Sequence, residues 1–457
     1  MLLTVDIGTS AFKSAVWDYN GNRLDFYSFA LSIDISDGVT HEVDPSRWLR
    51  AFEQSCKRLK GLPTVEAIVI SGNGPSLVPV QNEVSFFKNQ PAANALLWLD
   101  RRAEKYQAEA ADAAGDFVDA CFFLPKSLYL KNEKNELYNK TKYFLGCPEY
   151  LAYALTGQAR TVFPSDGFER WFWNDSILEK LKLEKEKFPP FIRPGDLFGT
   201  LISSTADYFG FKKNIPVISG GPDFFAAILG AGITEPKIAL DRTGSSEGIN
   251  LCTENRIFDR RLMSYGHPVK PFWNLSGIIN TAGKAIEWAY AILGVNNFDD
   301  FIALASESSK GSGGLVFLPF LAGERTPSSS ERASWSGINL GTGRKELANS
   351  ILEGIGFAVK DILGTMENAG EKAKQLRVTG GLSGCSLLNK IKADITGIEI
   401  IEGEYKEAEL LGLAVIGACA LGKFTSFKEA SDAFYRIGKR YEPDYSLHRL
   451  YSQLGKE

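Results

Sequence analysis

The feature that most constrains this chain is a short motif that occurs twice, once at the start of the sequence and once near its middle. In each copy an apolar run ends in an aspartate, a turn containing glycine, threonine and serine follows, and a second apolar run completes the motif. The first copy spans residues 2–17 and contains Asp6, and the second spans residues 238–251 and contains Asp241. Apolar runs of strand length around a glycine-containing turn predict a β-hairpin.

Backbone N–H groups and hydroxyls in such a turn can wrap a phosphate. A single copy is more often an ordinary hairpin, so the repetition is what favours the phosphate interpretation. Two copies far apart in the sequence predict two related domains that face one polyphosphate across a cleft.

The length and composition agree with two soluble domains. A chain of 457 residues fits two domains of roughly 200 residues or slightly more. We place the predicted boundary so that the N-terminal domain spans residues 1–235 and the C-terminal domain spans residues 236–457. The formal charge of −4 provides no field that would attract nucleic acid, so nucleic-acid binding is not expected, although a local basic patch stays open.

The sequence also predicts a cytoplasmic protein without a membrane span. No run approaches the roughly 20 apolar residues that a bilayer requires, and no secretory signal precedes the first strand. The six cysteines are scattered without a Cys-x-x-Cys pair, which is typical of reduced, mostly buried thiols. The three histidines lie apart from cysteines and from each other, which disfavours a zinc site or a histidine-based triad.

Strands and helices alternate along the chain, which predicts the α/β fold class. The apolar residues 65–70 predict a buried strand, and the loop after it contains Asn73 and Gly74. Ligands often bind where such strands end, although an ordinary turn is an equal alternative here. A second strand leads through two glycines to Asp223 at the edge of a predicted helix, and a third leads into Gly380 and Gly381. The last pattern suits the phosphate or the sugar of a nucleotide.

Helical patterns complete the domains. Asp44 and Pro45 predict the start of a helix with a buried apolar stripe, and residues 346–363 carry a long helical periodicity. Residues 106–175 predict a helical, aromatic-rich insertion on the first domain that helps to wall the cleft. The charges of its segment 126–142 are more often those of a solvated face.

Several segments, taken in order, resemble the FGGY family of carbohydrate kinases, and most closely the xylulokinases. The matching segments are residues 6–13 and 243–246 for the two phosphate turns, 98–102 for W-x-D-x-R, 220–223 for G-G-x-D, 323–327, 333–353 for the C-terminal signature, and 380–381. The resemblance implies two duplicated actin-like (ribonuclease H-like) domains with an interdomain cleft. It further implies that ATP binds against the second domain, that a small carbohydrate binds against the first, and that the domains close around both.

The resemblance assigns roles to individual residues. Asp223 is the predicted general base, because a sugar hydroxyl is a poor nucleophile until a carboxylate accepts its proton; a helix cap is the alternative. Asp6 is the predicted ligand of Mg²⁺, through water. Asp241 is either a second metal ligand or, as we favour, a brace of its hairpin. The predicted phosphate and nucleotide contacts are Thr9, Ser10, Lys13, Thr243, Gly244, Gly380 and Gly381.

The predicted carbohydrate contacts are Asn73, Gly74, Asp100, Arg102, Asp223 and Phe224. Asp100 and Arg102 have an equal alternative as members of surface ion pairs. The family's S-G-Q-M-H-G segment is replaced here by residues 71–76, without its Met and His, and Phe224 stands where the family has Asn or Gln. Unpaired hydroxyls would lose hydrogen bonds in such a site, so D-xylulose is not the predicted substrate.

Two functions therefore remain at the level of sequence. The first is ATP-dependent phosphorylation of a ketose or polyol. The second is a non-catalytic, nucleotide-gated carbohydrate sensor on the same fold, which the altered sugar loop suggests. Retention of Asp6 and Asp223 favours the enzyme. The sequence leaves a homodimer open.

Overall fold

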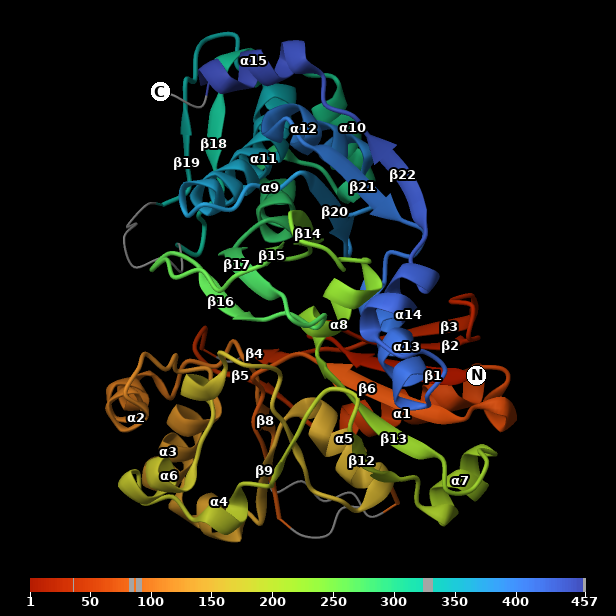
Figure 1. The fold of residues 1–457 in the computed structure, drawn as a ribbon. Helices are drawn as coiled ribbons and strands as arrows, with labels where there is room; N and C mark the ends of the chain where they lie inside the picture. Colours follow the sequence, from red (N-terminus) through yellow and green to blue (C-terminus); the bar gives the residue numbers. More distant parts are fainter. Residues whose placement is uncertain (36, 82–85, 88–92, 324–331, 455–457) are drawn as a thin grey trace. The chain divides into compact units, whose positions relative to one another are not determined.

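The computed structural model describes residues 1–35, 37–81, 86–87, 93–323 and 332–454. The chain forms two compact units, which we describe separately (Figure 1). The first contains Met1–Gly230 and Glu409–Phe434, and the second contains Ala231–Ala408 and Tyr435–Glu457. This division differs from the predicted one because residues 409–434, late in the sequence, pack with the first unit.

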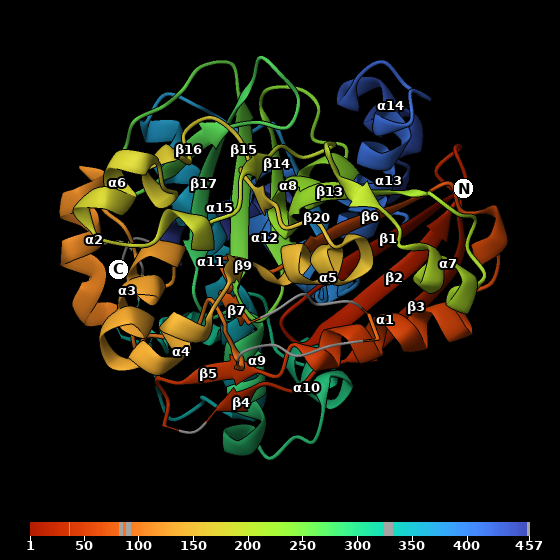
Figure 2. The same cartoon turned by 90° about the horizontal axis from the view of Figure 1, so that it is seen from below.

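The first unit is built on a mixed sheet with the order β12-β13-β6-β1-β2-β3 within the described residues. Strands β1 and β2 form an antiparallel hairpin that β3 extends, while β6 runs parallel to both β1 and β13. These strands lie side by side in Figure 2. Their bounds are β1 Leu2–Ile7, β2 Ala11–Trp17, β3 Arg23–Ala30, β6 Ala67–Gly72, β12 Leu197–Thr200 and β13 Pro216–Pro222.

The second unit repeats this plan in a sheet with the order β16-β17-β15-β14-β20-β21-β22. Strands β14 and β15 form the hairpin, β17 extends it in antiparallel fashion, and β20 and β21 follow in parallel on the other side. Their bounds are β14 Ile238–Thr243, β15 Glu247–Thr253, β16 Met263–Gly266, β17 Trp273–Ile279, β20 Gln375–Thr379, β21 Glu399–Gly403 and β22 Ile437–Tyr441.

The two sheets confirm the duplication that the repeated motif predicts. In each, a hairpin carries an antiparallel strand on one side and two parallel strands on the other, and an antiparallel strand closes the parallel edge: β12 beside β13, and β22 beside β21. The α/β class with two domains of this type is therefore confirmed. Parallel strands need buried faces, and helices supply the cover.

Helices of the first unit include the predicted one after Asp44, α1, whose Trp48 and Phe52 are buried. Figure 1 shows α13, in blue, beside the red and orange strands of this unit. A side chain at Gly412 would strike the backbone of Ala226 on α8, so glycine permits α13 to pack closely there. The helix bounds are α1 Ser46–Arg58, α2 Gln107–Ala114, α3 Phe123–Glu133, α4 Asn135–Lys140, α5 Cys147–Thr156, α6 Asp175–Lys180, α7 Ser203–Phe209, α8 Asp223–Gly230, α13 Ala408–Ala420 and α14 Phe427–Phe434.

The second unit contains the predicted long helix as α11, longer than expected at both ends. Its buried residues include Ile351 and Ile355, which pack in one core with Ile391 of α12. The helix bounds are α9 Gly283–Leu293, α10 Phe298–Ser306, α11 Arg344–Asn368, α12 Ser386–Thr396 and α15 Tyr445–Leu454. The short strands of both units are β4 Asp34–Ile35, β5 His41–Val43, β7 Val78–Val80, β8 Ala95–Leu96, β9 Tyr143–Leu145, β10 Thr161–Val162, β11 Phe191–Ile192, β18 Val316–Leu318 and β19 Ser334–Ser336.

Candidate functional site

Three strands of the first unit end side by side. Gly72 of β6 pairs with Ile7 of β1 on one side and with Pro222 of β13 on the other. Asp6, Asn73 and Asp223 therefore leave the carboxyl ends of adjacent strands at one edge of the sheet. In open α/β sheets this edge is where ligands bind, so the register brings together three residues that the sequence predicts for one site.

Asp6 lies among other charges at this edge. Its side chain is buried, one carboxylate oxygen accepts a 2.8 Å hydrogen bond from the Ser71 hydroxyl, and Lys13 stands opposite it in the hairpin. Burial raises the pKa of Asp6 to about 7, with further contributions from the charges of Glu409 and Asp223. The positive charge of Lys13 and the hydrogen bond from Ser71 act in the opposite direction and lower the Asp6 pKa.

Glu409 is a member of this group that sequence reasoning missed. It lies in the first turn of α13 and belongs to the first unit although it comes late in the chain. The only local signal is an acidic residue just before the apolar run that begins at Leu410. Nothing in that pattern predicts that it approaches Asp6.

Asp223 is the first residue of α8, as predicted, and it is half-buried. Its carboxylate accepts a 2.6 Å hydrogen bond from the N–H of Phe224. The role of Asp223 in catalysis stays a prediction.

The loop after β6 is braced from within. The Asn73 side-chain amide donates to the Ile7 carbonyl at 2.9 Å, and its oxygen accepts from the Ser76 hydroxyl at 2.8 Å. Beneath the loop, the Cys147 thiol donates to the Asn73 carbonyl at 3.0 Å. Asn73 thus holds the loop against β1, and contact of Asn73 or Gly74 with a carbohydrate stays a prediction.

Asp100 and Arg102 form an ion pair with a 2.7 Å contact, but the Asp100 side chain is fully buried. The two residues do form an ion pair, as the alternative states, but the pair does not lie at the surface. Asp100 also accepts the backbone N–H of His41, and the Arg102 guanidinium makes a second 2.6 Å pair with Glu42. Burial opposes the charge of Arg102, but the two carboxylates outweigh it and raise the Arg102 pKa.

Lys126 corrects a second expectation, because this lysine of the charged segment is buried rather than solvated. Its ammonium donates to the carbonyls of Pro75, Leu96 and Leu97 at 2.8–3.2 Å. Burial lowers the pKa of Lys126 to about 8. Lys126 therefore ties the loop after β6 to Leu96 and Leu97, which directly precede the W-x-D-x-R segment.

The same segment also reaches the first turn. The Trp98 indole N–H donates to the Thr9 hydroxyl at 3.1 Å, while Ser10 beside it is exposed. The Gly8 N–H is used within the turn, where it donates to the Ala11 carbonyl at 2.9 Å. Contacts of Thr9 and Ser10 with a phosphate stay a prediction.

An aromatic wall stands next to Asp223. The ring of Phe224 stacks on that of Phe168, with centroids 5.9 Å apart and an interplanar angle of 15°. Phe168 in turn contacts Trp171, and both are buried. The residue after the candidate base therefore offers an apolar face.

In the second unit, the turn between β14 and β15 is held by its surroundings. The Thr243 hydroxyl donates to the Thr379 carbonyl at 3.1 Å, and the Gly244 N–H donates to the Ser246 carbonyl at 3.0 Å. Contacts of Thr243 and Gly244 with a phosphate stay a prediction. Ser245, which sequence reasoning did not select, is the exposed residue of the turn.

The Gly380–Gly381 turn lies beside this hairpin, because Thr379 pairs with Arg242 on the adjacent parallel strand. Gly380 has a φ of +95°, and a side chain there would strike the Thr243 backbone, so only glycine fits. Gly381 is exposed, and a Cβ at its position would meet nothing within 4 Å. The two predicted nucleotide turns thus share one edge of the second sheet.

Asp241 braces its hairpin, as favoured from the sequence. Its carboxylate accepts a 2.6 Å hydrogen bond from Lys392, and both side chains are fully buried. A metal contact at Asp241 has no support in this arrangement. Of the predicted segment 323–327, residues 324–327 lie outside the described residues.

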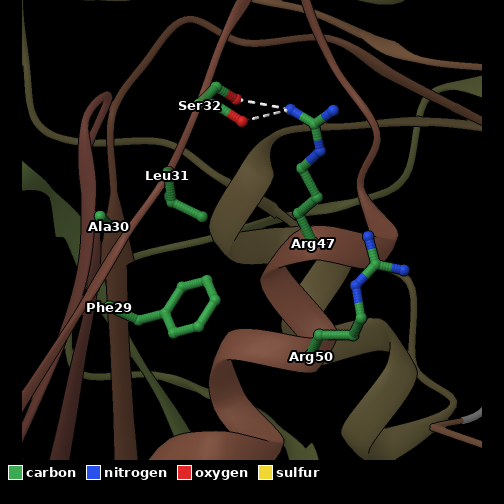
Figure 3. Close-up of a pocket in the computed structure, with 6 residues that line it drawn as sticks. All are labelled: Phe29, Ala30, Leu31, Ser32, Arg47 and Arg50. Atoms are coloured by element: carbon green, nitrogen blue, oxygen red, sulfur yellow. Dashed lines mark hydrogen bonds between the residues drawn. The ribbon is translucent and has the colours of Figure 1, made fainter.

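A separate hollow of about 270 Å³ lies on the first unit between β3 and α1 (Figure 3). It is lined by Phe29, Ala30, Leu31, Ser32, Arg47 and Arg50. Figure 3 shows Arg47 donating to the carbonyl and hydroxyl of Ser32, at 2.7 and 2.9 Å. None of the predicted site residues lines this hollow.

Three further observations concern metal-binding groups, membrane-spanning helices and the cysteines. Within the described ranges, no group of three or more His, Cys, Asp or Glu is arranged to hold a metal by itself. Across that same part of the chain, no helix combines the length and apolar character needed to cross a bilayer. All six cysteines are free thiols, as the sequence predicts.

Comparison with known proteins identifies relatives along the whole chain. The model of the FGGY family of carbohydrate kinases, N-terminal domain, matches residues 1–230, and that of the C-terminal domain matches residues 243–421. A xylulose kinase from Staphylococcus epidermidis is 28% identical over 99% of this chain and 94% of its own length. A gluconokinase from Bacillus subtilis is 23% identical over 96% of this chain and 91% of its own length.

Solved structures show the same fold. A ligand-bound xylulose kinase from Lactobacillus acidophilus superposes with a TM-score of 0.85 at 22% identity, covering 100% of this chain and 96% of the other. A glycerol kinase from Plasmodium falciparum, solved with ADP, gives a TM-score of 0.84 at 19% identity, covering 99% and 96%.

Proposed function

The chain belongs to the FGGY family of carbohydrate kinases, and on that premise we propose that it transfers the γ-phosphoryl group of ATP to a hydroxyl of a ketose or polyol, with Asp223 as general base. One observation carries the proposal: Asp6 and Asp223 come from the two strands that flank β6, and the strand register brings both to the carboxyl edge of the first sheet. The relatives, a xylulose kinase and a gluconokinase, support a small sugar or sugar acid as acceptor.

In the proposed reaction the acceptor hydroxyl gives its proton to the Asp223 carboxylate as its oxygen bonds to the γ-phosphorus. The bond between that phosphorus and the bridging oxygen breaks, and ADP leaves with the electron pair. Phosphoryl transfer depends mainly on positioning and charge stabilisation, so the site must hold the hydroxyl and the triphosphate in line.

The residues around Asp6 fit a magnesium ion. Mg²⁺ is usually bound by one or two carboxylates together with phosphate oxygens and waters. Asp6 would hold it, and Glu409 and Asp223 would add to the negative field that raises the Asp6 pKa. When bound, the ion supplies charge neutralisation of the β- and γ-phosphates.

The acceptor side is proposed from three neighbouring features. Arg102, held in place by the buried Asp100, supplies a polar group, the Asn73–Gly74 loop shapes the edge, and Phe224 presents its stacked ring beside the base. The Asn73 side-chain amide already forms hydrogen bonds with Ile7 and Ser76, so this loop has less capacity to hydrogen-bond the hydroxyls of a carbohydrate. A substrate with an apolar face near the reacting hydroxyl fits this wall best.

A screen of ADP release tests the proposal. Purified protein with ATP and MgCl₂ is given pentuloses, hexuloses, pentitols, glycerol and gluconate one at a time. We expect at least one acceptor to raise ADP formation well above the rate with ATP alone. If several compounds bind by calorimetry while none raises ADP formation, the alternative of a non-catalytic carbohydrate sensor replaces the kinase.

A further inference from the structure

A buried lysine of the second unit binds both strands of the second hairpin. The Lys392 ammonium, on α12, donates to the Asp241 carboxylate and to the Glu247 carboxylate, each at 2.6 Å. All three side chains have 0% exposure. Burying an ammonium between two carboxyl groups is costly, because each charged group loses its hydration.

The two acids flank the candidate phosphate turn. Asp241 is on β14 and Glu247 is on β15, where Glu247 pairs with Thr243 at the mouth of the turn. Two carboxylates at diagonal positions of a hairpin repel each other, and a cation between them reverses the sign of that interaction. Lys392 therefore fastens the two strands together directly beneath residues 244–246.

The same helix is joined to the other candidate nucleotide turn. Helix α12 begins at Ser386, shortly after Gly380 and Gly381, and its Asn389 amide donates to the Ser383 carbonyl at 2.6 Å. A single short helix thus contacts the hairpin through Lys392 and the glycine turn through Asn389. The two turns are already adjacent through the pairing of β14 with β20, and this helix holds each of them from one side.

Lys392 is also the only hydrogen-bond partner of both carboxylates among the described residues. The second oxygen of Asp241 and that of Glu247 have no partner there. Removing the ammonium would leave two buried acids facing each other under a turn that is proposed to hold an anion.

We propose that Lys392 is a positioning residue for the nucleotide: by binding Asp241 and Glu247 it fixes the turn 244–246 relative to the Gly380–Gly381 turn, so that both meet the phosphates of ATP. The inference rests on the proposed function, because it assumes that this edge of the second sheet binds the nucleotide. It assigns no contact between Lys392 and ATP.

The test uses a triple variant that removes the link without stranding a charge: Asp241→Asn, Glu247→Gln and Lys392→Met in the full-length protein. We expect the Kd for ADP, measured by calorimetry with MgCl₂, to rise about tenfold, because the turn 244–246 is no longer held in position for the phosphates. The KM for the acceptor should stay within about twofold. A purely structural role would lower the thermal midpoint without this selective loss of nucleotide affinity.

The matched control is Lys187→Met, which removes another buried lysine, in the first unit, where it donates to the Thr141 carbonyl at 2.7 Å. Its ADP affinity should equal that of the wild type. Glu247→Gln is the second variant, which keeps the pair of Lys392 with Asp241 and should weaken ADP binding about threefold.

The outcomes separate the two claims. If the triple variant folds and binds ADP like the wild type, the inference is overturned while the proposed function stands. If the triple variant does not fold, unchanged ADP affinity in Glu247→Gln overturns it. A wild-type protein that binds no nucleotide removes the proposed function and the inference with it.

Discussion

The two hairpins have the same topology, but their aspartates have different hydrogen-bond and charge partners. Asp6 has Lys13 opposite it, receives one hydrogen bond from Ser71, and lies in the field of Asp223 and Glu409. Asp241 is held instead by the buried ammonium of Lys392. The two hairpins thus share one backbone arrangement. In the first copy the aspartate lies near the candidate base, and in the second copy a buried lysine neutralises the aspartate.

This contrast indicates that the two hairpins have different roles in binding. The first turn combines an acid with the exposed Ser10, which suits a cation together with phosphate oxygens. The second turn, with its acid occupied, has only backbone groups and hydroxyls to offer a phosphate. The aspartate common to both motifs is therefore not evidence of two metal sites.

Within this comparison of the hairpins, the largest expected effect comes from Asp6→Asn. Loss of the acid should lower kcat by about two to three orders of magnitude, because charge stabilisation of the transferring phosphoryl group weakens. The thermal midpoint should not fall at neutral pH, since burial already disfavours the charge of Asp6. Steady-state kinetics and calorimetric unfolding measure both, and Asp241→Asn serves as the comparison.

The expected contrast for Asp241→Asn is the reverse: a lower thermal midpoint with a smaller change of kcat. If both variants lose kcat equally, the two aspartates have equivalent roles, and the inferred difference between the hairpins is wrong.

Lys392→Met should have the largest effect on stability. It leaves two buried carboxylates without a cation, which costs about 3–5 kcal/mol of unfolding free energy. Ser71→Ala, which removes the hydrogen bond to Asp6, should cost about 1 kcal/mol. Urea unfolding of each unit, followed by intrinsic fluorescence, gives both values. Equal losses would mean that the two aspartates are held with equal strength.

The pH dependence sharpens the same comparison. Burial, together with the nearby Asp241, raises the pKa of Glu247, against the opposing effect of Lys392. An acid whose pKa is raised by folding contributes stability at low pH that is lost as the pH rises through the folded-state value. Glu247→Gln should therefore flatten the fall in unfolding free energy between about pH 5 and pH 8. An unchanged pH profile would show that Glu247 is ionised throughout that range.

Much of this architecture is predictable because it is local. The apolar runs around Asp6 and Asp241 specify hairpins, and the strand before Asp223 specifies a helix start at that residue. The family signature then supplies the overall fold. Patterns of this kind depend on neighbours in the sequence, which a single chain displays.

The remainder depends on contacts between distant residues. The sequence gives no sign that Glu409 joins the first unit, that Lys126 is buried against three carbonyls, or that Lys392 binds Asp241. A charged residue in a helix is usually solvated, and only its tertiary partners make burial favourable. Asn73 illustrates the same limit, since its amide is engaged by Ile7 and Ser76 within the fold.

The smallest expected effect concerns selectivity. Phe224→Asn replaces the stacked aromatic face beside Asp223 with a polar group, so kcat/KM for a fully hydroxylated ketose should rise about tenfold relative to that for a deoxy analogue. Competition kinetics with the two acceptors measure this ratio. Phe168→Leu is the control, because it removes the stacking partner without adding a polar group. An unchanged ratio in Phe224→Asn would remove Phe224 from the acceptor site.

The most direct measurement of the central claim is the turnover of Asp223→Asn with the best acceptor, together with its affinity for ATP. Loss of the proton acceptor should lower kcat by about two to four orders of magnitude, while ATP binding stays close to that of the wild type. An Asp223→Asn protein that turned over at the wild-type rate would contradict the account.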